Sequence, residues 1–217
     1  MKISAFTKTY EGRRVLDFPG MELAPGEICA VIGSNGSGKS SLAGIAAGVL
    51  GADGGTAALH GRVNVGYMPQ KSYAFRMSVL KNLRLGGGDE AGAMEMLRKL
   101  GIDHLAKSSG KKLSGGETAR MALGRVLMEP HGLIILDEPT ASMDMESTAL
   151  SERLIRDYCR ETGAAALWVT HSVAQARRVS DKVLFLSKGE LREWGDTAQV
   201  LCAPRERETA EFLKFYE

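Results

Sequence analysis

The stretch Gly33-Ser34-Asn35-Gly36-Ser37-Gly38-Lys39-Ser40, which Ser41 continues, decides the fold of this chain. A short apolar run at residues 27–32 comes directly before it, and residues 39–49 have the character of a helix. A buried strand, a glycine-rich turn and a helix in this order are typical of a phosphate-binding loop. The sequence therefore predicts an α/β fold with a parallel sheet and a phosphate site at the end of one strand.

Each part of this loop suits a nucleotide. Glycine at positions 33, 36 and 38 lets the backbone approach a β-phosphate so closely that successive amide hydrogens point inward. Lys39 supplies positive charge to the β- and γ-phosphates, and Ser40 offers a hydroxyl to Mg²⁺. The helix that begins there adds its positive end. A plain glycine-rich turn with a surface lysine would need neither the strand before it nor the helix after it.

A second motif, Leu133-Ile134-Ile135-Leu136-Asp137-Glu138, places two acids directly after an aliphatic strand. A carboxylate at the end of such a strand is poorly placed for burial alone, and Asp137 is predicted to hold Mg²⁺ through water. Glu138 is predicted to act as the general base for an attacking water. The alternative is a charged turn between a strand and a helix, but that does not explain why two acids follow four aliphatic residues.

A third motif, Leu113-Ser114-Gly115-Gly116-Glu117, lies between the phosphate loop and the acidic pair. With all three motifs in this order, the chain resembles the nucleotide-binding subunit of an ATP-binding-cassette (ABC) transporter, from about Ile3 to about Trp194. The resemblance implies that ATP and Mg²⁺ are the ligands. It also implies a P-loop ATPase core with a parallel sheet, an N-terminal antiparallel β subdomain and a helical lobe that carries the third motif.

The resemblance assigns roles to three more residues. Gln70 matches the glutamine that senses Mg²⁺ and water, and His171 matches the histidine that contacts the γ-phosphate. Tyr10 matches the aromatic residue that stacks on adenine. Phe6 competes for that last role, and Tyr10 packing on its hairpin neighbours is the alternative.

The resemblance also implies that each ATP site is shared by two subunits. Ser114, Gly115 and Gly116 would cap the γ-phosphate of an opposing cassette, so that hydrolysis requires a dimer, and Asp144 would lie in the loop that crosses the interface. Glu117 stands where the family more often has glutamine, a departure that changes local charge without removing a phosphate contact. The expectation is an active ATPase.

The predicted organisation is one domain over residues 1–217. Residues 1–70 and 130–195 form the core, residues 71–129 the helical lobe, and residues 196–217 a helical tail. Alternating and helical periodicities predict the individual elements. Expected strands cover residues 3–9, 15–16, 27–32, 56–59, 63–68, 133–136, 165–170, 183–186 and 190–193, and expected helices cover residues 39–49, 91–100, 119–128, 148–160 and 206–216.

The charge balance, the cysteines and the length of the apolar stretches limit which partners and locations the chain can have. The 28 basic and 26 acidic residues nearly balance, so no strong field indicates nucleic acid. The three cysteines are far apart and match no metal spacing, which favours a reducing cytoplasm. No stretch reaches the roughly 18 apolar residues of a membrane span. The resemblance implies that the chain lies at the cytoplasmic face of the membrane, held there by permease subunits.

Three classes of function compete: a transporter ATPase, a cassette protein of DNA repair or translation, and a module that binds nucleotide without turnover. The second class usually has a coiled-coil insertion or two cassettes, and Glu138 and His171 argue against the third. The compact outline resembles importers of small ions, metal cations or oxyanions, which work with a permease and a solute-binding protein, although an exporter stays open. Tyr73 and Phe75 would lie near the groove that receives the permease, unless they fill the core of the helical lobe.

Overall fold

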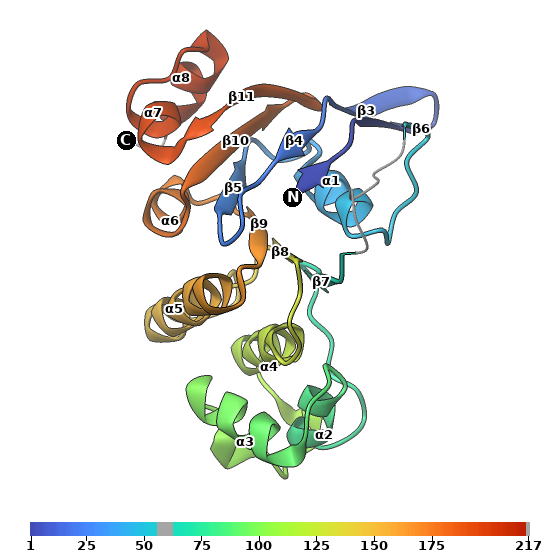
Figure 1. Ribbon diagram of the computed structural model, residues 1–217, viewed down its shortest axis with the longest axis vertical. Coiled ribbons are helices and arrows are strands. Elements are labelled where there is room, and N and C mark those ends of the chain that lie inside the picture. The colour runs from blue at the N-terminus through green and yellow to red at the C-terminus, as the bar shows by residue number, and fades with distance from the viewer. Residues whose placement is uncertain (56–62, 216–217) are drawn as a thin grey trace.

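The computed structural model describes residues 1–55 and 63–215 of the chain. A sheet with nine described strands occupies the upper part of the molecule in Figure 1. Three helices lie below it: α2 (Val79–Arg84), α3 (Glu90–Lys99) and α4 (Gly115–Leu127). The fold is thus a mixed α/β core with a helical lobe attached, the class that the sequence predicts.

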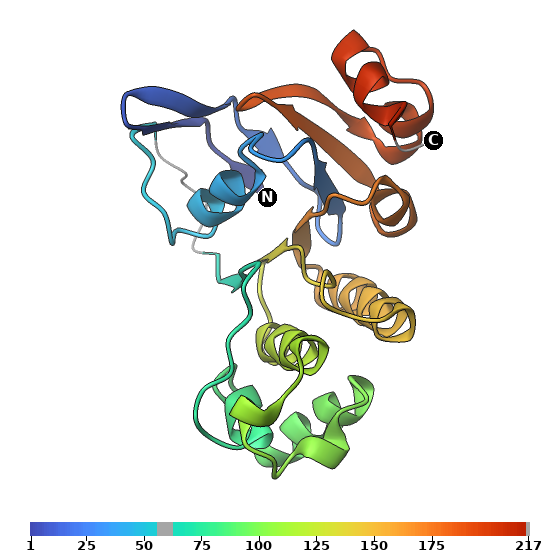
Figure 2. The ribbon, with the colours of Figure 1, turned by 180° about the vertical axis from the view of Figure 1, so that it is seen from behind.

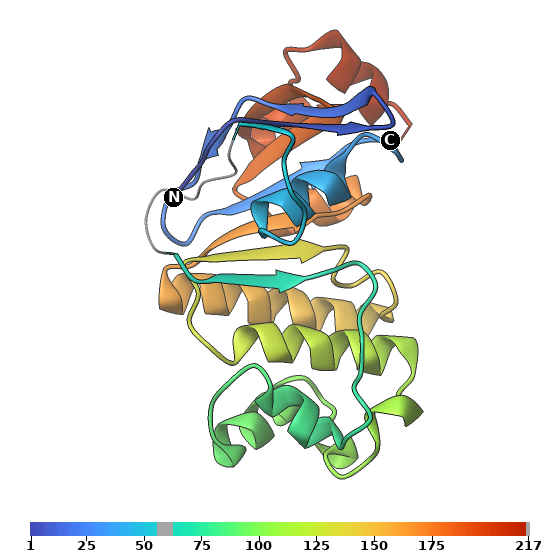
Figure 3. The ribbon, with the colours of Figure 1, turned by 90° about the vertical axis from the view of Figure 1, so that its right-hand side faces the viewer.

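Five neighbouring strands, which extend to one edge of the sheet, run parallel. In sheet order they are β10 (Lys182–Ser187), β5 (Ile28–Ile32), β9 (Ala165–Val169), β8 (Leu133–Asp137) and β7 (Val65–Met68). Because parallel strands end at the same edge, the segments that follow β5, β7, β8 and β9 meet there. Figure 3 shows β7 and β8 lying side by side with the same direction. This edge brings the phosphate loop, Gln70, Glu138 and His171 together.

The two faces of the sheet are packed by alternate residues of each strand. Ile134, Leu136 and Trp168 join a cluster with α4 and with α5 (Met145–Thr162). Their neighbours Ile135 and Leu167 join the cluster on the opposite face, where α1 (Lys39–Ala46) packs. Burial on both faces explains why these strands read as continuous apolar runs.

Antiparallel strands extend the sheet on one side. The hairpin of β2 (Phe6–Tyr10) and β3 (Arg13–Phe18) was predicted, and it turns at Glu11 and Gly12, which both have positive φ. The second predicted hairpin consists of β10 and β11 (Glu190–Asp196). Short strands complete this region: β6 (Gly54–Gly55) pairs with β2, and β1 (Lys2–Ile3) pairs with β4 (Met21–Glu22).

Several boundaries differ from the predictions. The helix expected at residues 119–128 begins earlier, at Gly115, because Ser114 caps it, and α1 ends at Ala46 near Gly48, whose φ is +73°. The strand expected at residues 56–59 lies outside the described residues. Three short helices, α2, α6 (Val173–Val179) and α7 (Thr197–Cys202), were not predicted as individual elements because six or seven residues show too little periodicity.

The helix predicted at residues 206–216 is α8 (Arg207–Leu213), and its expected last residue lies outside the described part. Helices α7 and α8 lie together against β10 and β11, at the upper corner of Figure 2. None of the helices in residues 1–55 and 63–215 has the length and apolar character needed to cross a membrane.

Candidate nucleotide site

A groove of about 520 Å³ gathers residues from four separate segments of the chain. Tyr10 and Val15 come from the hairpin of β2 and β3, Gln70 follows β7 and Glu138 follows β8, and the rest belong to the loop after β5 and the first turn of α1. The residues of this loop and turn that line the groove are Asn35, Gly36, Gly38, Lys39, Ser40 and Ser41. The fold thus places predicted adenine, phosphate and water contacts around a single groove.

The backbone conformation at position 33 and the closeness of a neighbouring strand both require glycine there. Its φ is +151°, and a Cβ added there would lie 2.1 Å from the carbonyl oxygen of Leu186 on β10. Gly38 has a φ of +101° and approaches the carbonyl of Val15. At Gly36 no atom lies within 4 Å, so its φ of +75° is the constraint there. The loop is therefore pinned between two strands of the sheet.

Lys39 crosses the inside of the loop. Its Nζ donates hydrogen bonds to the carbonyl oxygens of Gly33 and Ser34, both at 2.8 Å. Burial lowers the pKa of this ammonium, while the negative charges of Glu138 and Asp137 raise it. The charge of Lys39 is thus positioned at the loop by backbone carbonyls, with two carboxylates nearby.

Asp137 is 2% exposed, and its Oδ1 has no hydrogen-bond partner. Burial raises the pKa of its carboxyl, and a hydrogen bond with Ser40 opposes that rise. An unpartnered buried carboxylate oxygen beside a hydroxyl suits a hard cation such as Mg²⁺. No group of three or more His, Cys, Asp or Glu residues within the described residues forms a metal cluster, so hydroxyl, phosphate and water oxygens would have to complete the ligand set.

Glu138 adopts a strained backbone conformation, with φ +51°. Its N–H donates to the carbonyl of Val169 at 3.0 Å, which ties the end of β8 to the end of β9. The Oε2 atom of Glu138 lies 3.4 Å from Nδ1 of His171. The side chain of His171 is 60% exposed and that of Glu138 17%, so the pair lies at the edge of the groove. The sequence nominated both residues but did not predict their contact.

The third motif forms the N-terminus of α4. The Ser114 hydroxyl accepts from the N–H of Glu117, and the Glu117 carboxylate accepts from the N–H of Ser114 at 2.7 Å, a capping box. Hydrogen bonds from Ser114 hold the pKa of Glu117 below its usual range. Ser142 donates to the carbonyl of Gly115, so the loop before α5 packs on this motif. Asp144 caps α5 by accepting from the N–H of Ser147.

Within the described residues, Ser114, Gly115, Gly116 and Asp144 do not line the groove at the phosphate loop. Residues around α4 and the start of α5 form a separate surface in which Ser114, Gly115 and Asp144 are exposed. This placement leaves the γ-phosphate role of the third motif as a prediction.

The two aromatic candidates for stacking on adenine differ in their exposure. Phe6 is buried, with its ring centroid 5.2 Å from that of Phe18, whereas Tyr10 is 46% exposed and lines the groove. Tyr10 therefore remains the candidate for adenine, and Phe6 does not. Tyr73 and Phe75 are also exposed and contact each other edge to face, so they do not fill the core of the helical lobe.

Two residues that the sequence analysis missed hold this aromatic pair. The buried side-chain amide of Asn82, on α2, bonds to both the N–H and the carbonyl of Phe75. Arg125, on α4, donates to the carbonyl of Tyr73 and lies over the Phe75 ring. A polar residue within a helix gives no sequence signal for such contacts, because they depend on how the helices pack.

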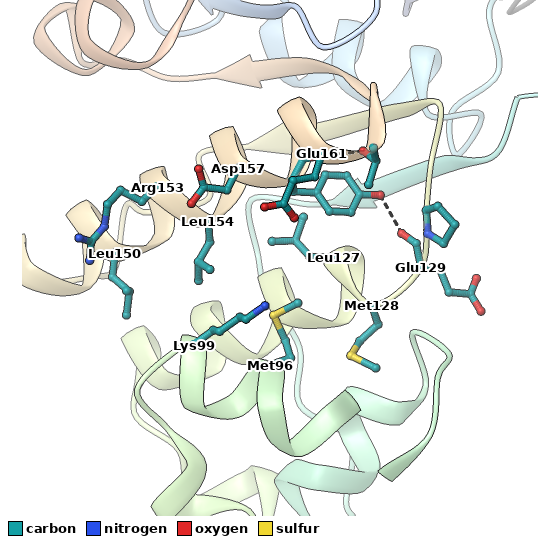
Figure 4. Close-up of a pocket in the computed structure, with 13 residues that line it drawn as sticks. Met96, Lys99, Leu127, Met128, Glu129, Leu150, Arg153, Leu154, Asp157 and Glu161 are labelled. Atoms are coloured by element: carbon teal, nitrogen blue, oxygen red, sulfur yellow. Dashed lines mark hydrogen bonds between the residues drawn. The ribbon is translucent and has the colours of Figure 1, made fainter. Parts of the chain in front are cut away.

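A groove of larger volume, about 640 Å³, lies elsewhere, between α3, α4 and α5 (Figure 4). Methionine and leucine side chains and several charged groups line it, and the Tyr158 hydroxyl donates to the carbonyl of Glu129 at its edge. It contains none of the predicted site residues. The smaller groove at the phosphate loop holds the complementary charges for a nucleotide, so volume is not the deciding criterion.

Comparisons with known proteins show the family of the chain. The family model described as ABC transporter matches residues 16–141. The tungstate uptake system ATP-binding protein TupC of Peptoclostridium acidaminophilum is 37% identical over 205 residues, covering 88% of this chain and 96% of that protein. The zinc import ATP-binding protein ZnuC of Vibrio vulnificus is 33% identical over 190 residues, covering 86% of this chain and 73% of that protein.

Among solved structures, a dimeric ATP-binding cassette in a post-hydrolysis state with ADP and Pi has a TM-score of 0.80 at 24% identity. The alignment covers 90% of this chain and 98% of that one, and it shows a shared fold. From the family match, the relatives and the site geometry together, the chain belongs to the ABC transporter family and is one of its ATPases.

Proposed function

We propose that this chain binds ATP with Mg²⁺ in the groove at the phosphate loop and hydrolyses it with Glu138 as the general base. The observation that carries this proposal is the shared groove, which joins the phosphate loop, Gln70 and Glu138. Tyr10 lies at the same groove and would stack on adenine. Ser40 and Asp137 would hold the Mg²⁺, which supplies charge neutralisation to the phosphates.

In this reaction Glu138 accepts a proton from water while the water oxygen bonds to the γ-phosphorus. The bond between that phosphorus and the β–γ bridging oxygen breaks, which yields ADP and inorganic phosphate. Lys39 stabilises the negative charge on the β- and γ-phosphates. His171, 3.4 Å from Glu138, would orient the γ-phosphate relative to the base, and Gln70 would orient the water.

The ATP would lie between two copies of the chain. The capping box of α4 engages the N–H groups of Ser114 and Glu117, and those of Gly115 and Gly116 would bind an anion that comes from outside the subunit. The same chain's groove does not include this motif, which supports capping in trans. Asp144 and the exposed Met145 beside it would lie in the interface between the copies.

The reaction would drive uptake of a small ion through permease subunits at the cytoplasmic face of the membrane, with a solute-binding protein as a further component. An oxyanion is the first candidate because TupC, a tungstate uptake protein, matches nearly the whole chain, and a metal cation is the second because of ZnuC. The exposed pair of Tyr73 and Phe75, beside Lys71, would receive the permease.

Two experiments test this function. Glu138→Gln should lower ATP turnover by about two orders of magnitude or more through loss of the base, while ATP binding persists. Unchanged turnover would remove Glu138 from the mechanism. For the cargo, the chain would be reconstituted in vesicles with the permease encoded beside it. ATP-driven uptake of tungstate but not of zinc is expected, outward transport would indicate an exporter, and failure to bind the permease would favour a non-transport cassette.

A further inference from the structure

Behind the proposed catalytic pair, one buried amide joins three separate segments of the chain. Gln175, in the first turn of α6, is 7% exposed. Its Oε1 accepts from the hydroxyl of Thr170 at 2.8 Å, and its Nε2 donates to the hydroxyl of Thr140 at 2.8 Å and to Oε1 of Glu152 at 2.9 Å. All three partners are buried. Both N–H groups and the carbonyl oxygen of the amide are thus engaged.

Two of these partners, Thr140 and Thr170, lie close in the chain to the residues proposed for catalysis. Thr140 follows Glu138 by two positions, and Thr170 directly precedes His171. On the other side of His171, the N–H of Ser172 donates to the Thr170 hydroxyl at 3.1 Å, and the Ser172 hydroxyl accepts from the N–H of Gln175. The Gln175 side chain therefore bridges the segment that carries Glu138 and the segment that carries His171.

The bridge is anchored to α5 by an ion pair between the half-exposed Arg178 and the buried Glu152. Arg178 donates from Nε and Nη2 to the two carboxylate oxygens of Glu152, at 2.8 and 2.6 Å. The Glu152 side chain is 3% exposed and sits on α5. Burial raises the pKa of Glu152, but hydrogen bonds from Arg178 and Gln175 leave it below its usual range. A carboxylate held ionised in this way is a fixed acceptor for the amide of Gln175.

The positions of Glu138 and His171 depend on contacts made by the segments that carry them. His171 is largely exposed, and Glu138 holds a backbone conformation that a glutamate does not favour. Both side chains, together with Gln175, line a small cavity of about 210 Å³ on this side of the site. The side-chain amide of Gln175 bonds to Thr140, Thr170 and Glu152, so its effect on Glu138 and His171 acts through Thr140 and Thr170.

We propose that Gln175 is a positioning residue for ATP hydrolysis, which holds the Glu138 and His171 segments in register through Thr140 and Thr170. This inference rests on the proposed roles of Glu138 and His171. An amide serves here because it donates to Glu152 and accepts from Thr170 at the same time. A carboxylate in its place would face Glu152 with the same charge.

The test compares Gln175→Met, which keeps the volume but loses the hydrogen bonds, with a matched control, Gln199→Met. Gln199, on α7, also donates to a buried glutamate, Glu193, at 2.8 Å, but it lines neither groove of the site. In steady-state ATPase assays, Gln175→Met should lower kcat by about 10- to 100-fold with KM for ATP nearly unchanged, as expected when reacting groups are misplaced. Gln199→Met should leave both constants unchanged.

A second variant gives a readout that packing alone does not produce. In Gln175→Glu, a protonated carboxyl can still donate to Glu152 and accept from Thr170, whereas the ionised form repels Glu152. Glu152, Arg178, Glu138 and His171 are the charged or titratable groups around this position. The deficit of Gln175→Glu relative to the wild type should therefore shrink as the pH is lowered.

Equal kcat for Gln175→Met and Gln199→Met, or a loss confined to KM, would overturn the positioning role. Should the methionine variant not fold, a deficit of Gln175→Glu that is independent of pH would overturn it instead. Glu138→Gln is measured in the same assay. If that variant keeps its turnover, the proposed function fails, and if it loses turnover while Gln175→Met does not, only the present inference fails.

Discussion

Replacing Gly33 with alanine should disable the nucleotide site by displacing the phosphate loop. The added Cβ would lie 2.1 Å from the Leu186 carbonyl oxygen, and carbon and oxygen atoms approach each other only to about 3.3 Å, so the loop or β10 has to move by about 1 Å. The φ of +151° adds backbone strain of about 1–3 kcal/mol, and overpacking adds about 1–3 kcal/mol. We expect the free energy of unfolding to fall by about 2–6 kcal/mol in total.

The same displacement moves amide hydrogens away from the phosphates. Loss of one hydrogen bond to a charged group, about 1.5–3 kcal/mol, weakens ATP binding by about 10- to 100-fold. Urea unfolding would measure the stability, and titration with a fluorescent ATP analogue would measure the affinity of the folded protein.

Gly163→Ala is the matched control. Gly163 ends α5 with a φ of +73° and has no atom within 4 Å of an added Cβ, so only the dihedral penalty of about 1–2 kcal/mol applies, without a change in ATP affinity. If Gly33→Ala were no less stable than Gly163→Ala and bound ATP like the wild type, the reasoning that β10 pins the loop would be refuted.

Three further outcomes follow from the structure. Ser114→Arg should leave ATP binding to the single subunit intact but prevent ATP-driven dimerisation on a Glu138→Gln background, measured by gel filtration, and a dimer that still forms would exclude capping in trans. The double variant Lys71→Glu, Tyr73→Ala should lose permease binding in pull-down assays but keep ATP binding, because an aromatic anchor contributes about 2 kcal/mol to the free energy of binding and Tyr73 is exposed. Retained permease binding would show that the permease docks elsewhere. The pKa of Glu152 lies below its ordinary value of 4.5, so the ionised side chain contributes fully to stability above pH 4.5, and this contribution disappears as the pH falls through the folded-state pKa. On acidification, Glu152→Gln should therefore lose unfolding free energy less steeply than the wild type. Parallel curves of unfolding free energy against pH for the two proteins would contradict this.

The motifs that bind phosphate could be predicted because each one is local in the chain. A buried strand, a glycine-rich turn and a helix place Lys39 and Ser40 together within eight residues of Gly33, and β8 delivers Asp137 and Glu138 as a pair. Local dihedral preferences and the alternation of buried residues suffice for such segments. The start of α4 at Gly115 was predicted too late, because its first turn is marked by the capping box of Ser114 and Glu117 and not by the spacing of apolar residues.

Contacts between distant segments depended on the order of strands in the sheet. Because β9 lies between β5 and β8, His171 comes to lie 3.4 Å from Glu138, and Gln175 reaches Thr140 across 35 residues of sequence. The choice of Tyr10 over Phe6 likewise rested on the pairing of β2 with β3, which places Phe6 opposite Phe18 in the core and Tyr10 opposite Arg13 beside the turn. Short segments sufficed to predict which groups can bind a nucleotide, since that chemistry is local in the chain. Which of these groups meet depends on packing between elements that are far apart in the sequence, because that packing sets the distances between them.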